Sequence, residues 1–363
     1  MIDMDGGARR HVSTIPTPLR AESNTVSKTI NVAVIGYGGA FNMGRNHLNW
    51  MKTAGFTPYA ACDLDPARTA SAGEDFPGIK TFTDYHALLA DPDVDLVVNI
   101  LPHNMHGKVN LDIVAAGKHC VCEKPFTITV AEADACIAKA KANGVTLSVF
   151  HNRRYDGDHL AMMEIIRKGE IGEVFHIEAG SGGFEYPGDW WRANKEISGG
   201  NLYDWGVHFI DWVLDLIPDP IENVTGFFHK RVWDKVTNED QTQAIIRFKN
   251  NKYADVRISS IDAAPRDRFR ILGTKGAIQM GQAWTGEFTL HRYLEGEVWE
   301  KSVKFQQRNY KDAGQAYYDM LAAHLFEGAP LEVTAESARR NIAVIEAAEA
   351  SSKSHQAEPV AHE

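Results

Sequence analysis

Short apolar runs alternate with longer amphipathic segments through the first 150 residues. Apolar, often β-branched runs bounded by turn residues predict buried strands at 30–35, 59–62, 96–100, 119–122 and 146–150. Helices are predicted at 43–54, between Pro102 and Gly117, and from the capping box Thr129–Glu132 to Gly144. Strands that are apolar throughout and alternate with helices are typical of a parallel, doubly wound sheet.

The pattern changes after residue 150. A helix that ends near Gly169 leads into runs that predict strands at 174–178, 222–230, 241–249, 252–261, 267–272, 286–293 and 297–305. A helix at 199–216 interrupts these strands, and helices at 313–327 and 334–350 follow them. Consecutive short strands separated by turn residues indicate a largely antiparallel sheet, so we expect a second, α+β domain.

Length and composition agree with two globular domains and exclude several classes of protein. A chain of 363 residues suggests two domains, at roughly 150 residues per domain. Hydrophobic residues make up 44% and charged residues 24%, as in ordinary soluble proteins. No apolar run approaches the ~20 residues of a membrane-spanning helix. The net charge of −10 argues against nucleic acid or an anionic membrane as the main partner.

Cysteine usage and the termini favour a reducing compartment. Four cysteines cannot form a disulfide scaffold, and no apolar segment of a secretory signal follows Arg9 and Arg10. Cys120 and Cys122 have no further ligands at a compatible spacing, so we expect reduced thiols and no metal site. We therefore expect a cytoplasmic protein, with a flexible arm at 1–28 and a fraying tail at 351–363. An arm that lies along a partner subunit is the alternative for residues 1–28.

A glycine-rich loop follows the first strand directly. Gly36 permits a tight turn, Gly38 lets a pyrophosphate approach the backbone, and the next helix offers free N–H groups to phosphates. Phe41 occupies the place of the third glycine of the dinucleotide fingerprint, and Gly44 indicates a loop three residues longer than usual. A purely structural glycine-rich turn is the alternative.

Asp63 stands at the end of the second strand. A carboxylate at this place would accept hydrogen bonds from a ribose diol. It would also repel a 2′-phosphate, so the sequence favours NAD over NADP. The alternative is a solvated aspartate at a strand end.

Glu123, Lys124 and Pro125 follow the strand 119–122, at the edge where doubly wound sheets bind ligands. A partly desolvated lysine near a nicotinium charge should have a lowered pKa, and could exchange a proton with a substrate hydroxyl. The peptide bond before Pro125 is a candidate for the cis form. A surface lysine at a strand exit is the alternative.

Asp204 and His208 are four residues apart on the predicted helix 199–216 and should share a face. A carboxylate beside an imidazole suits proton relay, because the imidazole titrates near neutrality. The alternative is an ion pair on the helix surface.

Aromatic and basic residues suggest the rest of a ligand pocket. Trp191 and Arg192 lie in a Gly/Trp-rich loop, and flat aromatic faces beside polar donors suit a sugar ring. Arg153 and Tyr155 mark the exit from the last parallel strand, at the domain junction. Core packing of the aromatics and salt-bridging arginines are the alternatives.

Taken together, these residues resemble the glucose–fructose oxidoreductase / inositol dehydrogenase / MocA family. The likeness covers residues 29–350 and includes Pro102, His106 and the pair Gly199-Gly200. It implies a Rossmann domain at 29–150, a substrate-binding and oligomerisation domain at 151–333, and a helix at 334–350 that packs back near the Rossmann domain. It also implies that Lys124 is the catalytic lysine and that the outer face of the second sheet makes subunit contacts. The longer loop and Asn201, in place of a frequent third glycine, depart from the family pattern.

The expected site is therefore specific. We expect the catalytic residues to be Lys124, His208 and Asp204. We expect the cofactor to contact Gly36, Gly38, Gly39, Ala40, Phe41, Asp63, Leu101, Pro102, His106, Glu123, Lys124 and Asn152. We expect the substrate to contact Lys124, Arg153, Tyr155, Trp191, Arg192, Asp204 and His208.

The sequence thus predicts an NAD-dependent oxidoreductase that acts on a secondary alcohol of a sugar, sugar derivative or cyclitol. A homodimer or homotetramer is expected, because an uncovered sheet face usually finds a partner. Two alternatives remain open: a redox-neutral glycosidase that retains NAD, and a non-catalytic sugar or dinucleotide sensor.

Overall fold

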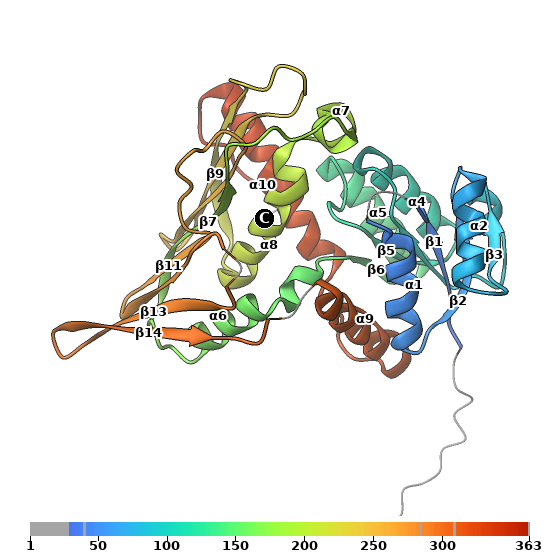
Figure 1. Cartoon of the computed structure of the whole chain (residues 1–363), viewed down its shortest axis with the longest axis horizontal. Helices are drawn as coiled ribbons and strands as arrows, with labels where there is room; N and C mark the ends of the chain where they lie inside the picture. Colours follow the sequence, from blue (N-terminus) through green and yellow to red (C-terminus); the bar gives the residue numbers. More distant parts are fainter. Residues whose placement is uncertain (1–28, 39–40, 284, 308–309, 362–363) are drawn as a thin grey trace, which may run out of the picture.

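The computed structural model describes residues 29–38, 41–283, 285–307 and 310–361, which form two α/β units side by side (Figure 1). The expected arm at 1–28 lies outside these residues. Within the described part of the chain, no helix is both long and apolar enough to cross a membrane.

The first unit is a Rossmann domain built on a six-stranded parallel sheet. Its strands are β1 (Asn31–Ile35), β2 (Thr57–Cys62), β3 (Lys80–Phe82), β4 (Leu96–Asn99), β5 (His119–Cys122) and β6 (Leu147–Val149). Their order, β3-β2-β1-β4-β5-β6, reverses between β1 and β4, and a doubly wound sheet binds ligands beside such a reversal. Its helices are α1 (Met43–Thr53), α2 (Pro66–Asp75), α3 (Tyr85–Leu89), α4 (His106–Ala115) and α5 (Val130–Asn143).

The register of this sheet places four loops at one edge. Ile35 pairs with Cys62 on one side and with Asn99 on the other, and Asn99 pairs with Cys122. The residues that follow these strands, among them Gly36, Asp63 and Glu123, therefore meet at the carboxyl edge. The sequence predicted β1, β2, β4, β5 and β6. It did not predict β3, α2 or α3, which are short or weakly apolar.

The second unit is an eight-stranded, mostly antiparallel sheet. Its strands are β7 (Val174–Gly182), β8 (Ile221–His229), β9 (Gln241–Phe248), β10 (Tyr253–Ser259), β11 (Phe269–Gly273), β12 (Gly276–Met280), β13 (Glu287–Leu294) and β14 (Glu297–Lys304). Among the described strands of this sheet, only the β7–β10 pair is parallel. The expected α+β architecture is confirmed, although β12 was not predicted because only two residues separate it from β11.

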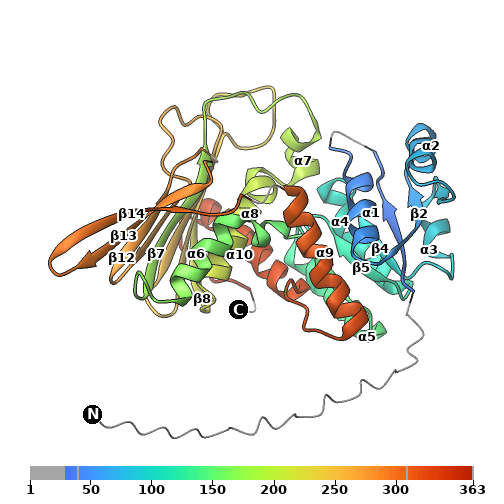
Figure 2. The ribbon, with the colours of Figure 1, turned by 60° about the horizontal axis from the view of Figure 1, so that its bottom comes forward.

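Helices cover one face of this second sheet. Figure 2 shows α6 (Gly157–Arg167), α8 (Val207–Leu216) and α10 (Ala335–Ser354) on the face turned toward the Rossmann domain. On the opposite face, the side chains of Phe227 and Tyr253 are each 42% exposed. That this face meets another subunit stays a prediction.

The predicted helix 199–216 is divided in the structure. A short helix, α7 (Lys195–Ser198), ends at Gly199 and Gly200, whose φ angles are +83° and +117°. A π-helical turn, η4 (Leu202–Gly206), then leads into α8. A single regular helix is therefore wrong here, because the two glycines break it and the π-turn changes its period.

The last two helices tie the units together. α9 (Tyr310–Glu327) packs on α1 of the Rossmann domain and on the 3₁₀ turn η2 (Asn152–Tyr155), where Tyr317 and Tyr318 are fully buried. α10 extends to Ser354, beyond the predicted end at 350. The expected fraying from 351 is also wrong, because Glu358 and Val224 exchange backbone hydrogen bonds of 2.8 and 2.9 Å.

The contact between β8 and α10 makes a testable prediction about stability. A Cβ atom on Gly226 would lie 1.9 Å from the carbonyl oxygen of Ala348, so Gly226→Ala must push α10 off the sheet. We expect a loss of about 1–3 kcal/mol in the free energy of unfolding, as for an overpacked core. Gly73→Ala, in α2, is the control, because no atom lies within 4 Å of its Cβ and alanine favours a helix by about 0.5–1 kcal/mol. Urea unfolding should move the two midpoints in opposite directions; equal midpoints would contradict the account.

Candidate functional site

A cavity of about 360 Å³ opens at the carboxyl edge of the Rossmann sheet and is closed by the second unit. Of the residues expected at the site, it is lined by Phe41, Leu101, His106, Glu123, Lys124, Asn152, Arg153, Trp191, Arg192, Asp204 and His208. The structure thus brings together side chains that are up to 167 positions apart in sequence. We refer to this cavity as the cleft.

The glycine-rich loop has the shape of a phosphate cradle. Gly36 has φ +94°, and a Cβ atom there would lie 3.2 Å from the backbone of Ile100. A Cβ atom on Gly44 would lie 2.7 Å from the Cα of Tyr37, so Gly44 provides the close packing of the missing third glycine. Among the described residues no side chain caps the N-terminus of α1, which leaves its N–H groups available to a pyrophosphate. The loop therefore fits a dinucleotide; Gly39 and Ala40 lie outside the described residues.

Asp63 holds this loop from the next strand. Its Oδ2 accepts hydrogen bonds from the backbone N–H of Tyr37 (3.0 Å) and of Gly38 (3.2 Å). Arg68, in α2, has its Nη1 atom 3.6 Å from the same oxygen and its side chain directly against Gly38. A carboxylate and a guanidinium therefore stand together where the fold places an adenosine ribose.

Lys124 and Asp204 form the central contact of the cleft. The Lys124 Nζ atom donates to Asp204 Oδ1 (2.8 Å) and to the Asp204 backbone oxygen (2.9 Å), and Arg192 pairs with the same carboxylate. Burial lowers the pKa of Lys124, and the carboxylate of Asp204 offsets this only in part. Burial alone would raise the pKa of Asp204, but the charges of Lys124 and Arg192 outweigh it and hold the pKa below its usual value. The pair therefore joins an ammonium with a lowered pKa to a carboxylate that stays ionised.

His208 lies in the cleft but is not paired with Asp204. Asp204 lies in the π-turn η4, where the i, i+4 spacing of an α-helix does not apply, and it points to Lys124 and Arg192 instead. Among the described residues no hydrogen bond joins Asp204 to His208, so the expected relay between them is wrong. Burial, and then the positive charges of Lys124 and Arg153, hold the pKa of His208 well below its usual value. His208 is therefore a neutral imidazole at physiological pH.

Glu123 is fixed by a histidine that the sequence analysis did not identify. His47, in α1, is fully buried, with Nε2 3.1 Å from Glu123 Oε1 and Nδ1 2.6 Å from the hydroxyl of Tyr318. Burial would raise the pKa of Glu123, but the contact with His47 and nearby positive charges lower it overall. The only signal in the sequence was a polar residue on the apolar face of helix 43–54.

Two further histidines order the cleft wall. The His106 ring lies between the backbone oxygens of Pro125 (2.6 Å) and Leu101 (2.8 Å), and so anchors the turn that carries Lys124. The Lys124–Pro125 peptide bond is cis, as expected. His103, also missed by the sequence analysis, has Nδ1 2.8 Å from the Ser198 oxygen and packs edge-on against Trp191.

An aromatic wall completes the cleft. The Arg192 guanidinium lies over the rings of Trp191 (4.7 Å) and Trp190 (5.5 Å), and Phe41 of the glycine-rich loop contacts Trp190 edge-on. Flat aromatic faces beside charged donors suit a hydroxylated ring.

Five of the described residues expected at the site do not line the cleft: Gly36, Gly38 and Asp63 at the glycine-rich loop, and Pro102 and Tyr155. Tyr155 packs against the Rossmann core, and its hydroxyl donates to Glu332 Oε2 (2.9 Å). The expected substrate contact of Tyr155 is therefore not supported, because its ring is directed toward the buried surface next to α9. Pro102 opens the turn η1 (His103–Met105) and is also absent from the lining. Among the described residues, no group of three or more His, Cys, Asp and Glu side chains could hold a metal ion.

Comparisons with known proteins agree with this geometry. Residues 30–151 match the model of an oxidoreductase family with an NAD-binding Rossmann fold, and residues 159–279 match the GFO/IDH/MocA C-terminal domain. An uncharacterized oxidoreductase of Schizosaccharomyces pombe is 34% identical over 258 residues, covering 68% of this chain and 69% of that protein. The scyllo-inositol 2-dehydrogenase (NADP(+)) IolW of Bacillus subtilis is 27% identical over 344 residues, covering 90% and 94%. The structure of the oxidoreductase YvaA of Bacillus subtilis superposes with a TM-score of 0.80 at 25% identity, covering 92% and 99%.

A dinucleotide cradle, a strand-end lysine in a cleft between two units, and matches to both domain models lead to one conclusion. The chain belongs to the Gfo/Idh/MocA family of NAD-binding oxidoreductases.

Proposed function

We propose that this protein is an NAD-dependent dehydrogenase that oxidises a secondary alcohol of a sugar, sugar derivative or cyclitol. The proposal depends on the environment of Lys124. Its Nζ atom lies in the cleft and donates to two oxygens of Asp204, and burial lowers the pKa of the side chain. The name of the IolW relative, an inositol dehydrogenase, supports a polyhydroxylated ring as substrate.

The two hydrogen bonds of Lys124 suggest how it moves a proton. A neutral amine has two N–H groups and one lone pair, so it can keep both bonds to Asp204 and direct the lone pair into the cleft. A nicotinamide cofactor bound in the cleft would supply the hydride acceptor for the carbinol carbon. The hydroxyl proton then passes to the Lys124 Nζ atom, and Asp204 stabilises the ammonium that forms. His208, a neutral imidazole on the same cavity, is placed to hold the hydroxyl or to accept the proton.

The cofactor is proposed to be NAD. Asp63 lines the ribose end of the loop with a carboxylate, which disfavours a 2′-phosphate. Arg68 stands beside it and is the group that would bind such a phosphate, and the IolW relative is named for NADP(+). The choice therefore depends on which of these two charges faces the ribose.

Removing the proposed base should stop chemistry without preventing cofactor binding. Lys124→Ala should lower kcat by about 10² or more, within the usual range for general acid–base catalysis, with little change in the Kd for NAD. His208→Ala should also lower kcat, and the double variant should lose less than the product of the two effects. Steady-state kinetics on any substrate found by an NADH-absorbance screen of sugars and inositols provides the measurement.

Wild-type turnover by Lys124→Ala would return Lys124 to a structural role. Turnover of a glycoside without net NADH would favour the redox-neutral glycosidase.

The dependence of kcat/KM on pH should reflect the titration of Lys124. Oxidation needs the neutral amine, so kcat/KM for oxidation should rise with pH through a pKa below the usual lysine value of about 10.4, and kcat/KM for reduction should fall. Asp204→Asn removes a charge that raises the pKa of Lys124 and should move this limb to lower pH. Arg192→Gln removes a charge that lowers the pKa and should move the limb to higher pH. Shifts in the same direction would contradict the assignment.

Cofactor preference should respond in opposite ways to two neighbouring charges. Asp63→Asn keeps an acceptor for the loop N–H groups but removes the charge, so the ratio of Kd for NADP to Kd for NAD should fall. Arg68→Gln should raise that ratio. Fluorescence titration with both reduced cofactors measures the ratio. Tighter binding of NADP than of NAD by the wild type would overturn the proposed cofactor.

A further inference from the structure

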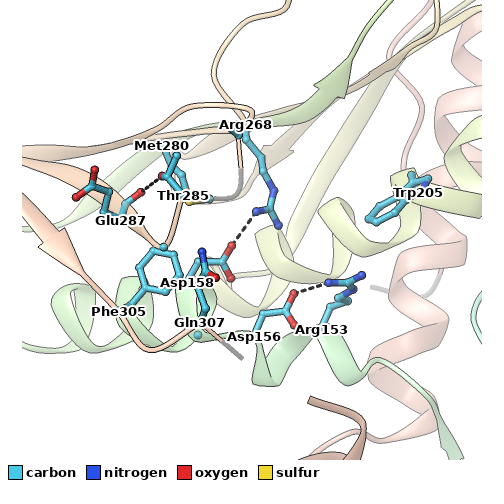
Figure 3. Close-up of a pocket in the computed structure, with 13 residues that line it drawn as sticks. Arg153, Asp156, Asp158, Trp205, Arg268, Met280, Thr285, Glu287, Phe305 and Gln307 are labelled. Carbon is cyan, nitrogen blue, oxygen red and sulfur yellow. Dashed lines mark hydrogen bonds and ion pairs between the residues drawn. The ribbon is translucent and has the colours of Figure 1, made fainter. Parts of the chain in front are cut away.

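A second cavity, of about 440 Å³, adjoins the cleft. It lies between α6 and the inner face of the second sheet, and Figure 3 shows its polar side chains converging from both walls. Arg153 and Trp205 line both this cavity and the cleft. The two spaces therefore share a wall, and the second is large enough for a small ligand.

The charges of the second cavity are already paired. Arg268 donates to Asp158 over 2.9 Å, with only 4% and 3% of the two side chains exposed. Arg153 donates to Asp156 over 3.0 Å (Figure 3). Each described guanidinium of the lining has a carboxylate partner, so the described side chains offer no excess positive charge with which to select an anion. A neutral, hydrogen-bonding ligand suits the cavity better.

The two carboxylate oxygens of Asp156, in this wall, differ in their partners. Asp156 Oδ1 is buried and accepts no hydrogen bond from the described residues, while Oδ2 accepts from Arg153. A buried carboxylate oxygen without a donor is costly, so a hydroxyl that donates to it would be bound favourably. Burial raises the pKa of Asp156 to about 6, so near neutrality this oxygen is an acceptor and at lower pH the group can also donate.

Trp205 connects this wall to the chemistry. Its ring lies 5.6 Å from the His208 ring between centroids, and the Arg153 guanidinium lies 5.5 Å from its centroid. The Trp205 side chain is 42% exposed, although its neighbours in η4 are largely buried. An exposed aromatic face between two cavities suits the apolar C–H face of a sugar. If a sugar ring in the cleft contacts Lys124 and His208, a substituent on that ring can extend past Trp205 into the second cavity.

We propose that the second cavity is a subsite for the remote hydroxylated ring of a disaccharide or glycoside, whose first ring is oxidised in the cleft. This inference rests on the proposed function for its reaction and adds the size of the substrate. Because Asp156 Oδ1 is closed to solvent, the wall must shift locally before a hydroxyl of the remote ring donates to it, and the new hydrogen bond favours that shift. Trp205 stacks on the face of the sugar where the two rings join.

The test compares matched sugars on the NAD-loaded enzyme. Glucose is paired with cellobiose and maltose, xylose with xylobiose, and myo-inositol with galactinol. For at least one pair, kcat/KM for the larger compound should exceed that for the single ring by about tenfold or more, which corresponds to about 1.4 kcal/mol.

A large side chain introduced into the second cavity should remove the difference in kcat/KM between the larger compound and the single ring. Ala283 is exposed on the rim of the second cavity, so Ala283→Trp should abolish the gain while changing kcat/KM for the single ring by less than about twofold. Ala116→Trp is the control, because Ala116 is an exposed residue at the end of α4, remote from both cavities. Equal use of single and double rings, or an equal effect of Ala283→Trp on both, would overturn the subsite.

Calorimetry with the same compounds separates this inference from the redox proposal. If no compound yields NADH but a disaccharide binds the wild type and not Ala283→Trp, the subsite stands and the dehydrogenase proposal fails. If single rings are oxidised and no disaccharide binds more tightly than its single ring, the subsite fails and the dehydrogenase proposal stands. Absence of both oxidation and binding contradicts both.

Discussion

The contact between Lys124 and Asp204 is the interaction on which the rest of the site depends. It joins the end of a Rossmann strand to a helix of the second unit, across 80 positions of sequence. A buried ammonium and carboxylate are costly to remove from water and are stable only when each has the other nearby. The pair therefore fixes how the two units approach one another at the cleft, and the same burial makes the ammonium easier to deprotonate. Burial of the pair is thus the common cause of the contact between the units and of the lowered pKa of Lys124.

The surrounding fold keeps this pair in place without a direct hydrogen bond to His208. The register of β1, β4 and β5 brings the glycine-rich loop, Asp63 and Glu123 to one edge. From the other unit, Gly199 and Gly200 end one helix, so that the π-turn can direct Asp204 toward Lys124. His47 and His106 then hold Glu123 and Pro125, the two residues that flank Lys124. The cleft is thus assembled from strand ends on one side and an irregular helix start on the other, as expected where function requires local departures from regular structure.

The features that could be predicted from the sequence are those that depend on residues close together in the chain. The parallel strands, the capping box at Thr129 and the strand-end positions of Asp63 and Lys124 follow from short-range patterns, and the structure has each of them. The π-turn was missed because apolar spacing at 3.6 residues cannot distinguish one extra residue in a turn. His47 was missed because its role depends on Glu123, 76 positions away. The packing of α9 on α1 and the second cavity, whose Asp158–Arg268 pair spans 110 positions, likewise arise only from tertiary structure.

The most direct measurement is the pKa of Lys124 itself, by NMR of the side-chain ζ-nitrogen in lysine-labelled protein. The Lys124→Arg variant, which lacks this one signal, assigns it. The account predicts that Lys124 titrates below the usual value of about 10.4, because burial outweighs the attraction of Asp204. It further predicts that Asp204→Asn lowers the value again. A Lys124 pKa at or above the usual value, as in an ordinary surface ion pair, would contradict the central claim that this lysine is prepared to accept the substrate's proton.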